Sequence, residues 1–287
     1  MMLKNVLFPV KGNESTARLA DMADFLKIFN TKTISLLWVG SKKKEKNTGF
    51  FEEVKGLFSD LGFETDFVQR SGAVADQIVQ YASESGTDFV CFVYKRKSPL
   101  KRALLGDVVT DVIRLSNLPV FVYKRPFSFQ KTRGIQTVMY ATGLSDTDIK
   151  ILGYLKHKNL KADELLLFHA GERAPDPVAE AKRVEMAYAR LTELEQQCRG
   201  TFARIDKKEA VAVSITRAIV SQSRSSSVDF IIAGKSDRAN ALEKMIGSTA
   251  ESLSHKSSCP VLIVPSIYEG FPGTALSQRR EDEVCHG

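Results

Sequence analysis

Short apolar runs alternate along the chain with longer segments in which apolar residues recur every three or four positions. In the first half, the apolar runs fall at Val6–Val10, Thr33–Val39, Glu64–Gln69, Phe89–Val93 and Val120–Tyr123. The helix-like segments between them cover Ser15–Phe29, Phe51–Leu61, Val74–Ser83 and Gly106–Leu115. Strands that helices cover on both faces are near-continuous apolar runs. This alternation predicts an α/β fold, a doubly wound five-stranded parallel sheet with right-handed crossovers.

The second half of the chain repeats the same alternation. Its strand-like runs are Thr137–Tyr140, Glu164–His169, Phe202–Ile205, Phe230–Ala233 and Val261–Val264. Its helix-like segments are Asp146–Leu155, Pro177–Cys198, Ile215–Gln222 and Gly247–Ser254. Three pairs of motifs share one spacing of 141 residues, at Asp88 and Asp229, Gly106 and Gly247, and Pro119 and Pro260. One match could be chance, but three at one spacing indicate a duplicated unit.

The duplication predicts two domains of one fold in a chain of 287 residues. We place them at 1–125 and 135–265, joined by a linker and followed by a polar tail at 266–287. Near the start of each copy, Val10-Lys11-Gly12 matches Ala141-Thr142-Gly143 at a spacing of 131 residues. The shorter spacing implies about ten extra residues in the middle of the second copy, which we expect in the Gly- and Pro-containing loop at 171–177.

The last strand of each copy is apolar and carries few charges that would block its edge. An exposed edge of this kind needs cover, because its free N–H and C=O groups invite pairing with another strand. We therefore expect Val120–Tyr123 and Val261–Val264 to pair antiparallel within one chain, which makes the protein an intramolecular pseudo-dimer. The sequence leaves any higher oligomer open.

A family resemblance is carried by the segment that ends the second copy. It runs from Gly234 to Val264 as G-K-S-D-R-A-N-A-L-E-K-M-I-G-S-T-A-E-S-L-S-H-K-S-S-C-P-V-L-I-V. This segment resembles the C-terminal signature of the universal stress protein family, G-x2-G-x9-G-[ST], followed by a helix and an apolar strand. The first copy has the same frame in Leu104–Tyr123, so the chain resembles a tandem universal stress protein. The resemblance implies an adenine nucleotide alpha hydrolase-like, Rossmann-like fold and a binding or regulatory role in the stress response.

The resemblance also implies a site for ATP or AMP, in which glycines and a helix N-terminus cradle the phosphates with backbone N–H groups. In the second copy, the positions assigned to such a site are Thr142, Ala170, Gly234, Asp237, Gly247, Ser248 and Thr249. Two of them depart from the pattern, since Asp237 replaces the second glycine and Thr142 replaces an aspartate at the end of the first strand. Asp237 would place a negative charge beside a phosphate, which costs on the order of 1 kcal/mol.

The first copy has lost more of this pattern. Val93 and Arg96 stand where the first two glycines would be, and Lys11 stands in place of the strand-end aspartate. Gly106 is kept, but Asp107 follows it where the signature has Ser or Thr. An aspartate at a helix start can cap the free N–H groups itself and so replace a phosphate. We therefore expect any nucleotide to bind in the second copy only.

The charge of the chain suggests another class of ligand. The formal net charge is +7. Basic residues converge on the strand ends of the first copy, at Lys11, Lys42, Lys43, Lys44, Lys95, Arg96 and Lys97. Such a cluster suits an anionic partner, which could be a phosphorylated metabolite, an acidic protein or a nucleic acid. Solvated loop lysines are the alternative, because no aromatic residues interleave with the basic run as single-strand binders require.

The motifs in the sequence leave three functions open. They are a nucleotide-responsive regulatory protein with an unknown protein partner, an adaptor that has lost ligand binding in both copies, and a very slow ATPase. The sequence contains no nucleophile elbow, HExxH or Walker A motif. It has no run of ~18 apolar residues, and its four cysteines have no CxxC spacing. We expect a cytoplasmic protein without a metal site, and we expect His255, beside Lys256, at the surface.

Overall fold

The computed structural model describes residues 3–40, 48–94, 107–124, 134–145, 147–157, 160–235 and 249–266. The strands of the first half are β1 (Asn5–Val10), β2 (Thr33–Val39), β3 (Glu64–Arg70), β4 (Phe89–Val93) and β5 (Val120–Tyr123). Those of the second half are β6 (Ile135–Thr142), β7 (Ala162–Gly171), β8 (Arg204–Val211), β9 (Phe230–Lys235) and β10 (Val261–Pro265). Together they form one ten-stranded sheet in the order β3-β2-β1-β4-β5-β10-β9-β6-β7-β8.

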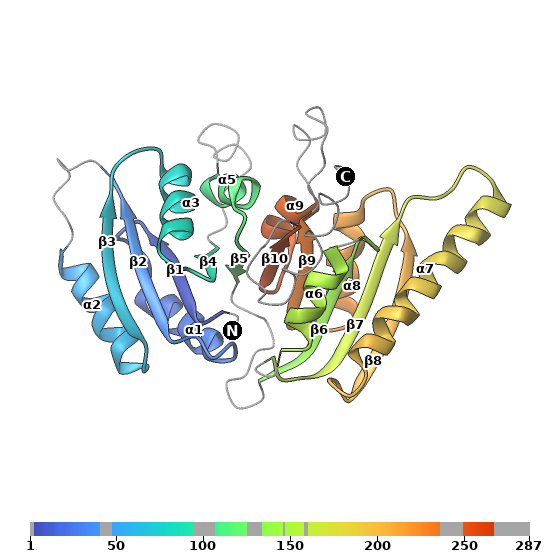
Figure 1. The fold of residues 1–287 in the computed structure, drawn as a ribbon, viewed down its shortest axis with the longest axis horizontal. Helices are drawn as coiled ribbons and strands as arrows, with labels where there is room; N and C mark the ends of the chain where they lie inside the picture. Colours follow the sequence, from blue (N-terminus) through green and yellow to red (C-terminus); the bar gives the residue numbers. More distant parts are fainter. Residues whose placement is uncertain are drawn as a thin grey trace, which may run out of the picture.

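The strand order is the same in the two halves when each is followed from its outer edge to the middle of the sheet. Neighbouring strands within each half run parallel. The two halves meet at β5 and β10, which pair antiparallel with Phe121 opposite Leu262 (Figure 1). Both the doubly wound fold and the pairing of the last strands are therefore confirmed.

Helices cover both faces of the sheet. They are α1 (Thr16–Lys27), α2 (Thr48–Asp60), α3 (Val74–Glu84), α5 (Val108–Leu115), α6 (Thr147–Leu155), α7 (Pro177–Cys198), α8 (Ile215–Ser225) and α9 (Thr249–Lys256). One core packs buried side chains of α1, α2, α6 and α7 against one face. The other core packs those of α3, α5, α8 and α9 against the opposite face. The central strands are therefore buried on two sides, which explains why they are continuous apolar runs.

An aromatic cluster joins the two halves on one face of the sheet. The Phe25 ring of α1 stacks on Phe121 of β5, with 5.5 Å between their centroids. Phe230 of β9 lies 5.9 Å from Phe121 and 5.6 Å from Phe29. Buried aromatic pairs of this kind add about 0.5–1.5 kcal/mol each beyond the area that they bury. Apolar packing as well as strand pairing therefore holds the pseudo-dimer together.

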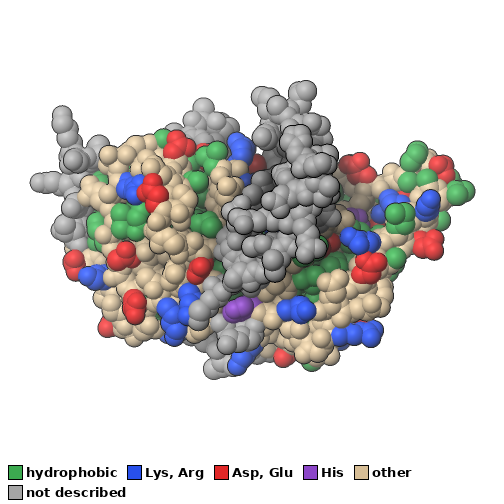
Figure 2. Space-filling view, viewed as in Figure 1, with side chains coloured by type: hydrophobic (Ala, Val, Ile, Leu, Met, Phe, Trp, Pro, Cys, Tyr) green, Lys and Arg blue, Asp and Glu red, His purple; other side chains and the backbone are tan. Residues whose placement is uncertain are grey.

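The extra residues of the second half lie in a helix and not in the loop at 171–177 where we expected them. Helix α7 has 22 residues, against 13 in its counterpart α2. Its N-terminal end extends beyond the edge of the sheet (Figure 1). Hydrophobic side chains are visible at this end in Figure 2, and Val178 is 80% exposed.

The position of one predicted strand was also wrong. We expected a strand at Phe202–Ile205, whereas β8 covers Arg204–Val211. This edge strand carries charged side chains that form ion pairs, such as Lys207 with Glu195 of α7, so it has no apolar run to reveal it. Of the helices in the described part of the chain, none combines the length and the apolar character needed to span a bilayer.

Candidate functional site

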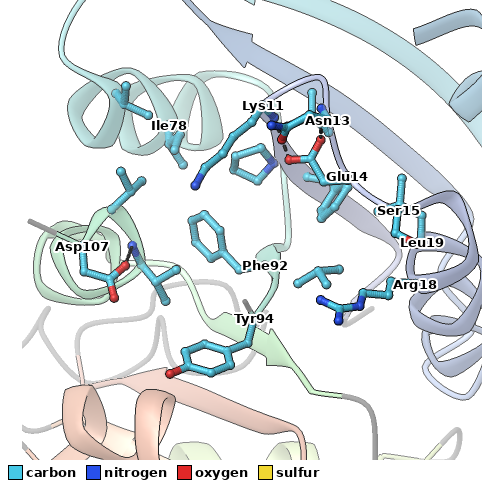
Figure 3. Close-up of a pocket in the computed structure, with 17 residues that line it drawn as sticks. Lys11, Asn13, Glu14, Ser15, Arg18, Leu19, Ile78, Phe92, Tyr94 and Asp107 are labelled. Carbon is cyan, nitrogen blue, oxygen red and sulfur yellow. Dashed lines mark hydrogen bonds between the residues drawn. The ribbon is translucent and has the colours of Figure 1, made fainter. Parts of the chain in front are cut away.

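Each half has a point where the strand order reverses, between β1 and β4 and between β6 and β9. Ligands of open α/β sheets usually bind in the crevice at the carboxyl ends of such strands. In the first half this crevice is a cavity of about 610 Å³, bordered by the ends of β1 and β4 and by α1, α3 and α5 (Figure 3). The volume lies within the range of roughly 300–1,000 Å³ that is usual for small-molecule sites.

In the turn after β1, backbone N–H groups are hydrogen-bonded to a side chain of the same turn. The Glu14 carboxylate accepts hydrogen bonds from the backbone N–H groups of Lys11, Gly12 and Asn13, at 2.8, 3.1 and 3.2 Å (Figure 3). Three successive N–H groups form a concave site that could hold an anion. Because Glu14 fills it, these three N–H groups are already hydrogen-bonded within the turn.

The start of α5 is also occupied by a side chain of the protein. Asp107 is the N-cap residue, and its Oδ1 atom accepts a hydrogen bond from the Val109 N–H at 3.2 Å. Its Oδ2 atom lies 3.4 Å from His255 Nε2 of α9. The predicted capping by Asp107 is therefore confirmed. A carboxylate stands at the helix start where the family signature has Ser or Thr.

In the second half, Thr142 belongs to a buried polar network. Its hydroxyl donates to Asp148 Oδ1 at 2.8 Å and accepts from the Leu144 N–H at 2.8 Å. The Tyr140 hydroxyl donates to the same carboxylate oxygen. Burial raises the pKa of Asp148, and the hydrogen bonds from Tyr140 and Thr142 oppose that rise. Thr142 is only 5% exposed, so its hydroxyl is used inside the protein.

The first strands of the two halves correspond at a spacing one residue longer than we predicted. Asp88 accepts hydrogen bonds from the N–H groups of Lys4 and Asn5. Asp229 accepts them in the same way from Gln136 and Thr137. The contacted residues are 132 positions apart, whereas the motif comparison gave 131.

The turns that follow these strands agree with the corrected spacing. Gly12 has a φ of +85° and Leu144 has a φ of +53°, so these two residues hold the same left-handed position. Lys11 therefore corresponds to Gly143, one residue after Thr142. Matching Gly12 to Gly143 by residue type caused the error, because Leu144 adopts a conformation that usually favours glycine.

Other predicted site residues lie near the carboxyl ends of the second-half strands. At Gly234 of β9, an added Cβ would lie 3.1 Å from Thr147 Oγ1 and 3.3 Å from Ile151 Cδ1 of α6. The glycine therefore lets α6 pack closely on the end of β9. Ala170 is buried in β7 opposite Ala210.

Helix α9 covers Thr249–Lys256, where we expected a helix at Gly247–Ser254. Several predicted site residues fall outside the described residues, namely Lys42, Lys43, Lys44, Lys95, Arg96, Lys97, Gly106, Asp237, Gly247 and Ser248. Lys11 is described and lines the first-half cavity.

Contacts between α5 and α9 connect the two halves at the helix that borders the cavity. His255 Nε2 lies 2.8 Å from Thr110 Oγ1, and Arg114 forms an ion pair with Glu251 at 3.1 Å. The His255 side chain is only 13% exposed, so its predicted surface position was wrong. Its partner lies 145 residues away in the sequence, and no local pattern could have indicated it.

A model of the universal stress protein family matches two segments of the chain, residues 32–124 and 134–265. The chain belongs to the universal stress protein family. Within this family it is similar to universal stress protein MJ0577 of Methanocaldococcus jannaschii, 34% identical over 85 residues, which are 30% of this chain and 52% of that protein. It is also 30% identical to universal stress protein MJ0531 of the same organism over 83 residues, 29% of this chain and 49% of that protein. The chain thus spans about half the length of these two relatives.

Solved structures show the same fold over nearly the whole chain. A universal stress protein from Archaeoglobus fulgidus matches with a TM-score of 0.67 and 17% identity, covering 92% of this chain and 97% of that one. A functionally unknown protein from Pseudomonas aeruginosa matches with a TM-score of 0.69 and 15% identity, covering 92% of this chain and 93% of that one. The fold of nearly the whole chain, with both of its units, therefore also occurs in these solved structures.

Proposed function

We propose that this tandem universal stress protein is a cytoplasmic binding and regulatory protein of the stress response, with one adenine nucleotide, ATP or AMP, bound in its second half. In this proposal the phosphates lie at the backbone N–H groups of Gly247, Ser248 and Thr249 and beside Gly234. The adenosine lies over the carboxyl ends of β6 and β7. Nucleotide occupancy changes the contacts with a protein partner, without a need for turnover.

The observation that carries this proposal is the Asp107 carboxylate at the start of α5. It accepts a hydrogen bond from the Val109 N–H and so uses a donor that a phosphate would need. Its charge also repels a phosphate. The corresponding residue of the second half, 141 positions later, is Ser248, whose neutral hydroxyl can donate to a phosphate. The same helix start therefore favours an anion only in the second half.

Substitution of Ser248 by the residue found at the equivalent position of the first half tests the proposal. Titration calorimetry with ATP and with AMP should give one binding event in the parent protein. Ser248→Asp should weaken that event at least ten-fold, because a carboxylate then stands beside the phosphates. Ser248→Ala is the matched control and should cost only a few-fold in affinity, since it removes one hydroxyl and adds no charge. A parent protein that binds neither nucleotide, or a Ser248→Asp variant that binds as the parent does, would contradict the proposal.

The chemical identity of the nucleotide recovered after incubation distinguishes binding from hydrolysis. The protein should be incubated overnight with ATP and then denatured, and the released nucleotides separated by chromatography. Recovery of unchanged ATP supports a regulatory binding protein. ADP or AMP that accumulates with time, and that Ser248→Asp abolishes, would identify a slow ATPase instead.

A further inference from the structure

We propose that the first-half cavity binds a small monocarboxylic acid with an apolar body, a ligand class distinct from the nucleotide of the second half. The cavity of about 610 Å³ opens at the strand ends between β1 and β4. It combines an apolar lining, two cations that pair with no other described residue, and two carboxylates that are already hydrogen-bonded. These three features together select the ligand.

The body of the cavity is apolar. Its lining includes Phe8, Val10, Ile78, Phe92, Val108 and Val109. At its border, Val74 of α3 is 41% exposed. Apolar surface left uncovered next to a cavity gains about 25 cal/mol per Å² when a ligand removes it from water. An apolar ligand body is therefore favoured here.

Two cationic side chains, those of Lys11 and Arg18, line the same cavity. The Lys11 side chain extends toward the middle of the cavity, and Arg18 reaches toward it from α1 (Figure 3). Within the described part of the chain, neither the Lys11 ammonium nor the Arg18 guanidinium has a hydrogen bond or an ion pair. Both groups are donors only, and a guanidinium can hold a carboxylate through two parallel hydrogen bonds. The ligand should therefore carry an acceptor group with a negative charge.

A polyphosphate does not suit this cavity. The backbone donors of the β1 turn are held by Glu14, and the start of α5 is held by Asp107. A nucleotide would have to bring several negative charges close to both carboxylates without gaining these donors. A monocarboxylate needs only the two side-chain cations and keeps its apolar body against Phe92 and its neighbours.

The test uses 4-phenylbutyrate as the probe and its neutral analogue 4-phenylbutanol as the comparison. Binding to the full-length protein should be measured by titration calorimetry. We expect one equivalent of the acid to bind, and the alcohol to bind at least ten-fold more weakly. Lys11→Met and Arg18→Met should each weaken the acid at least five-fold. Both side chains are exposed, so these changes should not disturb folding, which circular dichroism checks.

Lys150→Met provides a matched control, because Lys150 is the counterpart of Arg18 on α6 at the spacing of 132 residues. It should leave the affinity for the acid unchanged. Equal binding of acid and alcohol would overturn the proposal, as would a folded Lys11→Met, Arg18→Met double variant that binds like the parent. No binding of the acid, or its displacement by ATP, would also overturn it. Ser248→Asp should not affect the acid, which separates a failure of this inference from a failure of the nucleotide proposal.

Discussion

The two halves of the sheet share a strand order and differ at the residues where their strands end. In the first half, the carboxylates of Glu14 and Asp107 satisfy the turn after β1 and the start of α5. In the second half, the Thr142 hydroxyl accepts a hydrogen bond from the Leu144 N–H in the turn after β6, and the sequence has Ser248 at the position that corresponds to Asp107. The comparison shows that the two halves of a duplicated framework keep the same strand order and an apolar core while side chains at their strand ends differ.

The halves also contribute unequally to the seam between them. At the antiparallel pair of β5 and β10, Phe121 faces Leu262. The aromatic cluster around Phe121 draws Phe25 and Phe29 from the first half and Phe230 from the second. The aromatic part of the seam therefore comes mainly from side chains of the first half, although the second half is the predicted nucleotide site.

Removal of the central ring of the seam should have the largest effect. Phe121→Ala should lower the free energy of unfolding by about 3–5 kcal/mol, because it leaves a cavity in a fully buried cluster. Urea denaturation measures this loss. Tyr188→Ala on α7 is the control, since this aromatic ring is 43% exposed, and it should cost less than about 1 kcal/mol. Equal losses in the two variants would show that the cluster does not hold the halves together.

Substitutions of the two corresponding signature glycines should have different effects on ATP binding. Gly247→Val should weaken ATP binding at least a hundred-fold, about 2.7 kcal/mol, because it places bulk against the phosphates and strains the turn. Gly106→Val should leave both the affinity and the number of bound nucleotides unchanged. Calorimetric titration of the two variants makes the comparison, and equal losses would contradict the asymmetry.

Lys124, on the first-half side of the seam, should make the free energy of unfolding depend on pH. It is buried at the end of β5, where the second half has Pro265, and its Nζ donates to the Ser257 carbonyl at 2.7 Å. Burial lowers the pKa of Lys124 from 10.5 to about 8. Between these two pH values the unfolded chain binds more protons than the folded one, so the contribution of this residue to stability rises with pH.

A comparison with Lys124→Met isolates this effect. From about pH 8 to about pH 10, the parent should gain about 2 kcal/mol of unfolding free energy relative to the variant. Urea denaturation at several pH values gives the two slopes. A difference that stays constant or falls with pH would show that Lys124 is not desolvated.

The smallest predicted effect concerns Asp237 in the second half. Asp237→Gly removes a charge beside the phosphates and should tighten ATP binding roughly ten-fold, with and without magnesium. No change would indicate that the carboxylate faces solvent. Weaker binding that appears only with magnesium would indicate that Asp237 helps to hold the cation, and would contradict repulsion.

The sequence predicted the central elements of the fold because apolar periodicity is a local signal. The strands next to the seam are buried on both faces, and their runs marked them within a residue or two. Strand β8 lies at an edge and contains the charged run Asp206-Lys207-Lys208-Glu209, so its pattern gave the wrong position. The motif spacing revealed the duplication, but residue type misplaced the β6 turn, where Leu144 takes the left-handed position.

At the candidate site, the sequence predicted only contacts that a residue makes within its own helix. Asp107 caps α5 as its position implied. The network of Tyr140, Thr142 and Asp148 could not be predicted, because it depends on how α6 lies on β6. The contact of His255 with Thr110 requires both halves to be folded and paired. The first-half cavity likewise depends on the spacing of β1, β4 and three helices in space.

The number of nucleotides bound per chain tests the difference between the halves most directly. Equilibrium dialysis of the parent protein against labelled ATP, taken to saturation, gives this number. The account predicts one ATP per chain, and saturating 4-phenylbutyrate should leave that number unchanged. Two ATP molecules per chain would contradict the exclusion of phosphates by Asp107, and none would contradict the second-half site.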